Sequence, residues 1–149
     1  MTEIRFYHLT RGALEEVLPR MLEATLARGM RAVVMVGSAE RVESLNAHLW
    51  TYEPGSFLPH GSARDGAAAR QPVWLTAADE RPNDATYLFL SDGARCADLG
   101  PYERVSEIFD GRSDDAVAAA RERWTAYREA GHDLQYWQQG ERGGWERKA

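Results

Sequence analysis

A continuous apolar run, Ala32–Val36 (AVVMV), most constrains the fold of this chain because segments with helical periodicity flank it. A short run that is apolar at every position is typical of a strand buried on both faces, as in a parallel sheet. Residues 13–28 before it repeat apolar side chains every three or four positions, and so do residues Ala39–Trp50 after it. The run is therefore expected to be a central strand between two helices.

Other segments extend this alternation of strands and helices. Ile4–Leu9 alternates and is rich in aromatic residues, while Pro72–Leu75 and Tyr87–Leu90 are short apolar runs. Arg104–Phe109 also alternates, and we expect it to be an edge strand. Within the first helical segment, Pro19 is expected either to kink the helix or to delay its start. The order of elements predicts an α/β fold with a mostly parallel sheet.

Two segments have no clear place in that sheet. Thr51–Arg70 is rich in Gly, Pro, Ser and Ala, and we expect a long surface loop that carries an apolar cluster around Phe57. Residues 134–149 are too polar to be core throughout, so we expect a C-terminal tail that Trp137 and Trp145 hold to the surface. The sequence contains no internal repeat and no sign of a second domain. Residues 1–149 are therefore expected to form a single domain.

The segment Ser113–Gly131 has the clearest helical signals in the chain. Ser113 is a good N-cap, and Asp114 and Asp115 place negative charge at the positive end of the helix dipole. Gly131 lies where a glycine commonly ends a helix. We therefore expect a helix with well-defined ends.

One face of this helix has an unusual composition. Val117, Arg121, Trp124 and Arg128 follow the spacing i, i+4, i+7, i+11, so they share a face. In one interpretation Trp124 is a core residue and the aliphatic parts of the arginines cover it. In the other, the face is a socket for an acidic peptide, in which guanidinium groups bind carboxylates and the indole binds an apolar side chain. The sequence leaves both interpretations open.

Motifs of catalysis and cofactor binding are missing. The turn at Gly37–Ser38 lacks both the glycines and the lysine of a phosphate-binding loop. The four histidines have no metal-ligand spacing, so we expect no metal, and no serine lies in a nucleophile elbow. We therefore expect a protein without a catalytic site or cofactor, whose role is to bind other proteins.

Charge and composition narrow the possible partners. A net charge of −5 argues against a protein whose main function is to bind nucleic-acid backbones. The single cysteine, Cys96, excludes an internal disulfide. No apolar run approaches the ~20 residues that span a membrane, and the N-terminus does not resemble a signal peptide, so we expect a cytoplasmic protein with no membrane partner.

Several short segments carry a resemblance to a known family. They are FYHL (Phe6–Leu9), LNAHLW (Leu45–Trp50), SFLPH (Ser56–His60), PVWL (Pro72–Leu75) and ARERWTAYREAG (Ala120–Gly131). In order and spacing the chain resembles, nearly end to end, the chi subunit of bacterial DNA polymerase III, an accessory subunit of the clamp loader in DNA replication. The resemblance implies a Rossmann-like, three-layer α/β sandwich without a functional nucleotide site, and a subunit without catalytic activity.

The resemblance also implies two protein partners and the residues that bind them. Family members bind the acidic C-terminal tail of single-stranded DNA-binding protein (SSB) and the psi subunit, and they meet DNA only indirectly. The tail site is expected at Trp50, Arg121 and Trp124, with help from Arg128, and the psi contact at Phe57.

This sequence departs from the family at two positions of the tail site. Thr125 and Val117 replace basic residues, which lowers the positive charge there. Two alternatives to the bridging role remain. One is a nucleotide-binding or enzymatic protein that uses the crevice near Gly37–Ser38. The other is a direct binder of single-stranded nucleic acid.

Overall fold

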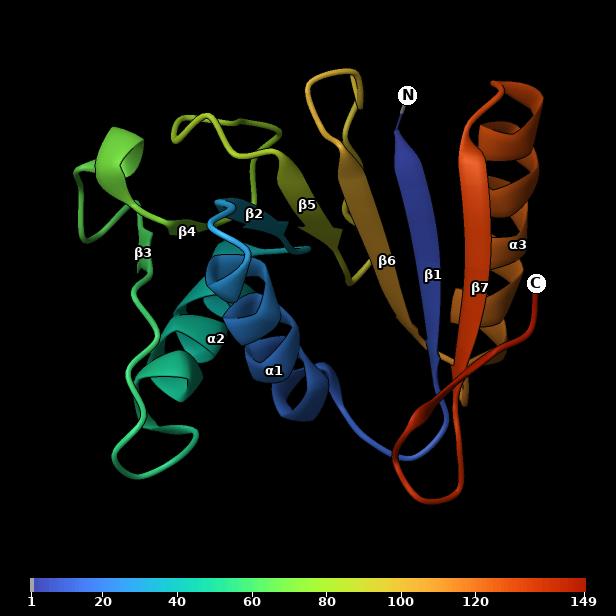
Figure 1. The fold of residues 1–149 in the computed structure, drawn as a ribbon, viewed down its shortest axis with the longest axis horizontal. Helices are drawn as coiled ribbons and strands as arrows, with labels where there is room; N and C mark the ends of the chain where they lie inside the picture. Colours follow the sequence, from blue (N-terminus) through green and yellow to red (C-terminus); the bar gives the residue numbers. More distant parts are fainter. Residues whose placement is uncertain (1) are drawn as a thin grey trace.

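The computed structural model describes residues 2–149, which form one eight-stranded sheet with helices on both faces (Figure 1). The strands are β1 (Glu3–Leu9), β2 (Ala32–Met35), β3 (Gly61–Ser62), β4 (Val73–Thr76), β5 (Tyr87–Leu90), β6 (Arg104–Asp110), β7 (Asp133–Gln139) and β8 (Trp145–Arg147). Their order in the sheet is β3-β4-β2-β5-β6-β1-β7-β8. All pairs are parallel except β7 with β8.

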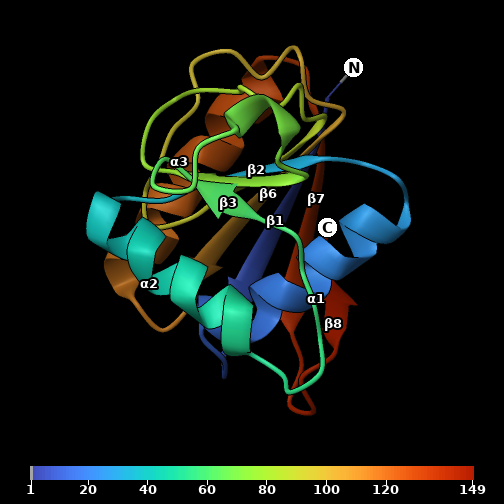
Figure 2. The same cartoon turned by 90° about the vertical axis from the view of Figure 1, so that its left-hand side faces the viewer.

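The helices complete a three-layer sandwich. Helices α1 (Leu14–Ala27) and α2 (Ala39–Thr51) cover one face, and α3 (Asp114–Glu129) covers the other (Figures 1 and 2). A short 3₁₀ helix, Ala68–Arg70, precedes β4. The α/β sandwich with a mostly parallel sheet is confirmed. No helix within residues 2–149 is both long and apolar enough to cross a membrane.

The two faces of the sheet have separate cores. On the α1–α2 face, helix residues such as Leu18 and Leu45 pack on Val34 and Phe89 of the strands. On the other face, α3 covers Phe6 and its neighbours in β1, β6 and β7. Loop residues also bury the α3 side of the sheet, Ala85, Leu99 and Tyr102 among them. The alternation of side chains along each strand explains this division.

Pro19 lies inside α1 and does not delay its start. Proline has no N–H, so the carbonyl of Glu15, four residues earlier, loses its helical partner. The His48 ring on α2 makes the replacement hydrogen bond, with Nε2 2.7 Å from the Glu15 carbonyl oxygen. This bond satisfies the freed carbonyl and ties α2 to α1.

Two sequence expectations about the sheet are wrong. Strand β6 is not an edge strand, because β5 and β1 flank it. Its polar residues Ser106 and Glu107 suggested an exposed face, but both are buried. Residues 134–149 do not form a surface tail, because β7 pairs with β1 along most of its length and β8 extends the sheet. This region is polar because β7 lies near the edge of the sheet, where its side chains are only partly covered.

Candidate protein-binding surfaces

Helix α3 presents the arginine and tryptophan face that its sequence predicts. The Ser113 hydroxyl caps the helix by accepting a hydrogen bond from the amide of Ala116 at 3.2 Å. On the buried side, Arg123 and Tyr127 donate hydrogen bonds to Glu107 on β6 at 3.1 and 2.6 Å. These contacts fix the rotation of the helix, so that Arg121 and Arg128 are exposed.

Trp124 combines the two interpretations of that face, because it is partly buried in the core while one side remains accessible. Its ring makes edge contacts with Phe6 and Tyr136, with centroids 5.4 and 5.9 Å apart. The indole is therefore held in place between Arg121 and Arg128, the two exposed arginines of the helix. A rigid aromatic side chain with flanking guanidinium groups is typical of a peptide-binding site.

Strands β1 and β7 add two residues that the sequence analysis missed. His8 Nδ1 lies 2.6 Å from the Tyr136 hydroxyl, and both side chains belong to the α3 face of the sheet. Burial lowers the pKa of His8, and the positive charge of Arg121 lowers it further. Because these residues come from three separate segments, no local sequence pattern could have grouped them. We call Arg121, Trp124, Arg128, His8 and Tyr136 the α3 surface.

A second aromatic surface lies on the opposite side of the sheet. Trp50, at the end of α2, is 48% exposed, and Phe57, in the loop that follows, is 73% exposed. The Trp50 ring contacts Phe57 and His60, with centroid distances of 6.0 and 4.5 Å. His60 is itself fixed, since its ring nitrogens meet the carbonyl oxygens of Leu58 and Asn46. We call Trp50 and Phe57 the α2 surface.

The expectation of one socket that contains both Trp50 and Trp124 needs correction. Trp50 ends α2, and Trp124 lies on α3, and these helices cover opposite faces of the sheet (Figure 2). One short peptide end cannot pack against both indoles at once. The structure instead groups Trp50 with Phe57.

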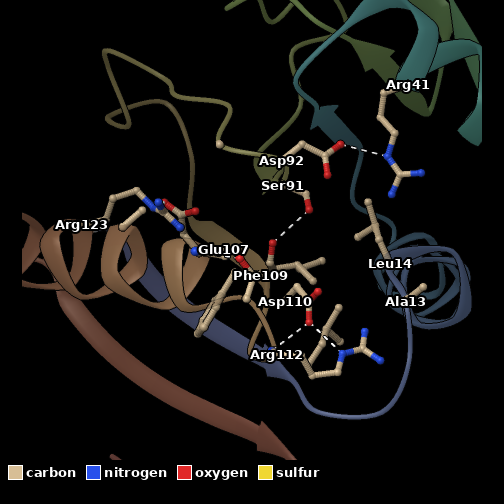
Figure 3. A pocket seen from close by; sticks show the side chains of 16 residues that line it. Ala13, Leu14, Arg41, Ser91, Asp92, Glu107, Phe109, Asp110, Arg112 and Arg123 are labelled. Atoms are coloured by element: carbon tan, nitrogen blue, oxygen red, sulfur yellow. Dashed lines mark hydrogen bonds and ion pairs between the residues drawn. The ribbon is translucent and has the colours of Figure 1, made fainter.

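The crevice at the carboxyl ends of the strands holds a cavity of about 430 Å³ (Figure 3). It lies where β1 leads to α1 on one face and β6 leads to α3 on the other, the usual position of ligand sites in open parallel sheets. Its three cations are already paired. Arg41 binds Asp92, Arg112 binds Asp110, and Arg123 binds Glu107, at 2.8 to 3.1 Å.

The turn at Gly37–Ser38 is the place where the alternative function, nucleotide binding, would be located. This turn is also poorly suited to binding phosphate. The Ser38 hydroxyl caps α2, and the adjoining cavity of about 190 Å³ is lined by two acidic residues, Asp79 and Asp92, against one basic residue, Arg95. Nearby, burial and then Asp79 raise the pKa of the Cys96 thiol to about 11, which keeps it protonated at neutral pH. No cluster of three or more metal-ligating side chains is found within residues 2–149.

Comparison with known proteins agrees with this arrangement. The chain is 29% identical over 108 residues to a probable DNA polymerase III subunit chi of Rickettsia prowazekii, a match that covers 70% of this chain and 66% of that protein. It is 25% identical to the DNA polymerase III subunit chi of Escherichia coli, over 83% of this chain and 84% of that protein. For the Pseudomonas aeruginosa protein of the same name, the identity is 28% over 91% of this chain and 95% of that protein. The family described as DNA polymerase III chi subunit, HolC, matches residues 1–135, and this chain belongs to that family.

Proposed function

We propose that this chain is a non-catalytic accessory subunit that bridges the clamp loader to SSB in the bacterial cytoplasm. The proposal rests on one observation: the α2 surface and the α3 surface lie on opposite faces of the sheet. Two surfaces separated by the body of the protein can hold two partners at once without steric competition. This is the geometry that a bridging subunit requires.

The α3 surface suits the acidic tail of SSB. The terminal aromatic side chain of the tail would pack against Trp124, and Arg121 would bind the terminal carboxylate, with Arg128 one helical turn beyond the indole. His8 and Tyr136 border the same position and can donate further hydrogen bonds. Thr125 and Val117 add no charge, so the two arginines supply the electrostatic part of the binding.

The α2 surface suits the psi subunit. Trp50 and Phe57 are the two large apolar side chains that stay exposed in the described structure, and they contact each other. Exposed aromatic pairs of this kind commonly form the centre of a protein–protein interface. Relative to the sequence analysis, Trp50 moves from the tail site to the psi site because of its position beside Phe57.

The decisive experiment measures both partners on one sample. A labelled acidic peptide ending in Pro-Phe is titrated into the chain by fluorescence anisotropy, with and without saturating psi from the same organism. We expect the same peptide affinity in both titrations, and a complex of all three components in size-exclusion chromatography. If psi displaces the peptide, or if the peptide does not bind at low salt, the bridging function is refuted.

A further inference from the structure

A small cavity on the α1 side of the sheet gathers positive charge that neither proposed surface uses. It has a volume of about 170 Å³ and lies where α1 passes over β5, β6 and β1. Three arginines line it: Arg5 from β1, Arg104 from β6 and Arg28 from the end of α1. On a chain with a net charge of −5, such a concentration of guanidinium groups calls for an explanation.

A single carboxylate only partly neutralises these arginines. Glu3 accepts hydrogen bonds from Arg5 Nη2 at 3.1 Å and from Arg104 Nε at 3.0 Å, and from the Gln135 amide at 2.7 Å. Although burial of Glu3 acts to raise its pKa, the charges of Arg5 and Arg104 outweigh this effect and lower it. Glu3 is therefore ionised at neutral pH. One negative charge against three positive charges leaves an excess of two.

The arginines also keep hydrogen-bond donors available. Arg28 Nη1 donates to the Tyr87 hydroxyl at 3.2 Å, which leaves its Nε and Nη2 groups without an acceptor in the described chain. The Arg104 guanidinium lies 5.0 Å from the centre of the Tyr87 ring, and only its Nε is bound to Glu3. Each guanidinium group thus holds a fixed position and still has free N–H groups.

Ser106 adds a polar group to the lining of the cavity. The residue is 3% exposed and lines the cavity. The sheet register places Ser106 between Arg5 on β1 and Phe89 on β5. The Ser106 hydroxyl can donate and accept hydrogen bonds, so it adds a polar group to the wall of the cavity that the arginines line.

We propose that this cavity binds a phosphate group, either of a nucleotide or of the backbone of single-stranded nucleic acid. Hydrogen-bond donors approach the cavity from β1, β6 and α1. This arrangement matches a tetrahedral anion with several oxygens better than a planar carboxylate, because a single guanidinium group can satisfy a carboxylate. Tyr7 also lines the cavity, and the register pairs it with Trp137 on β7. A base attached to the phosphate can therefore stack on an aromatic side chain beside the cavity.

The test follows backbone amide signals of the full-length chain, labelled with ¹⁵N, in NMR titrations. The probes are inorganic phosphate, thymidine monophosphate and a short oligothymidylate. Arg28→Gln removes one exposed guanidinium from the cavity, and Arg20→Gln, on the same helix but outside the cavity, is the matched control. We expect saturable shifts at Arg5, Thr25 and Ser106, and about tenfold weaker binding in Arg28→Gln but not in Arg20→Gln.

The outcomes distinguish the source of the phosphate and can overturn the site. Binding of the monophosphate with an affinity equal to or greater than that of the oligonucleotide identifies a nucleotide site. Tighter binding of the oligonucleotide, with a steep salt dependence, identifies a site for single strands. The proposal is overturned if no probe shifts these amides saturably, if Arg20→Gln weakens binding equally, or if only the acidic tail peptide binds there. Tail and psi binding by Arg28→Gln are independent of this result, because neither surface includes Arg28.

Discussion

The Trp50 and Phe57 rings lie 6.0 Å apart at an angle of 40°, and both remain largely exposed to solvent. The Trp50 ring also contacts His60, whose centroid is 4.5 Å away. The pair is therefore an exposed apolar feature at the end of α2. Burial of such a pair by a partner releases ordered water without a large loss of side-chain freedom.

Replacing Phe57 with alanine should remove psi binding and leave the fold intact. We expect at least about 30-fold weaker binding in calorimetry with psi, because central aromatic residues commonly contribute 2 kcal/mol or more. The free energy of unfolding should change by less than about 0.5 kcal/mol, since the ring is exposed. Tail-peptide affinity serves as the internal control. An unchanged psi affinity would place the psi contact elsewhere.

Replacing Arg121 with glutamine should weaken binding of the SSB tail peptide by about tenfold at low salt, through the loss of a charge-assisted hydrogen bond. The wild-type affinity should itself fall as salt is added, because exposed charges are screened over ~10 Å at 0.1 M ionic strength. Arg20→Gln, on α1, is the matched control for loss of one exposed charge. Equal anisotropy curves for Arg121→Gln and wild type would exclude Arg121 from the site.

The pKa of His8 should report on the same surface. Burial and then Arg121 lower this pKa from 6.5, so the neutral ring is favoured in the folded protein. The resulting stability is fully present above about pH 6.5 and is lost as pH falls through the lower folded-state value. NMR titration of the His8 ring should give a higher pKa in Arg121→Gln, and also when the tail carboxylate binds. A pKa unchanged in both cases would separate His8 from Arg121 and from the tail.

Gly111 should be intolerant of a side chain. A methyl group there would collide with the His8 ring and would lie 2.7 Å from the carbonyl oxygen of Leu9. The His8 ring can move, but the backbone carbonyl is fixed by the sheet. Gly111→Ala should therefore destabilise the fold by about 1 to 3 kcal/mol in denaturant unfolding and shift the His8 ring signals. Gly143→Ala, at a glycine with no atoms near the new methyl, is the comparison, although its φ of +85° adds a local cost.

The buried pair Glu107–Arg123 should show strong coupling. Glu107 is 2% exposed and Arg123 is 9% exposed, and their side chains meet at 3.1 Å. Burial raises the pKa of Glu107, although the charge of Arg123 opposes this shift. Arg123→Met alone should cost about 3 to 5 kcal/mol, because an unpaired carboxylate remains buried. The double variant with Glu107→Leu should recover much of that loss. Simple additivity of the two single variants in unfolding experiments would disprove the coupling.

The periodicity of apolar residues in the sequence was sufficient to predict the helices and most of the strands. The apolar runs at β2 and β5 and the capping residues of α3 act through local geometry, so the chain alone reveals them. Strand β6 was correctly expected as a strand but wrongly placed at the edge, and β7 was expected as a tail, because the environment of both depends on distant segments. Glu107 is buried only because Arg123 of α3 reaches it, and β7 enters the sheet only because β1 is available as a neighbour.

The features of the candidate sites also divide into those that the sequence reveals and those that depend on the tertiary structure. The spacing of Arg121, Trp124 and Arg128 on one helix face is a property of the sequence, since 3.6 residues complete each turn. The separation of Trp50 from Trp124 is not, because it depends on which face of the sheet each helix covers. Handedness and strand order decide that choice, and both emerge only when the whole sheet is assembled. The sequence therefore determined which side chains are available for binding, and the tertiary structure decided which of them act together.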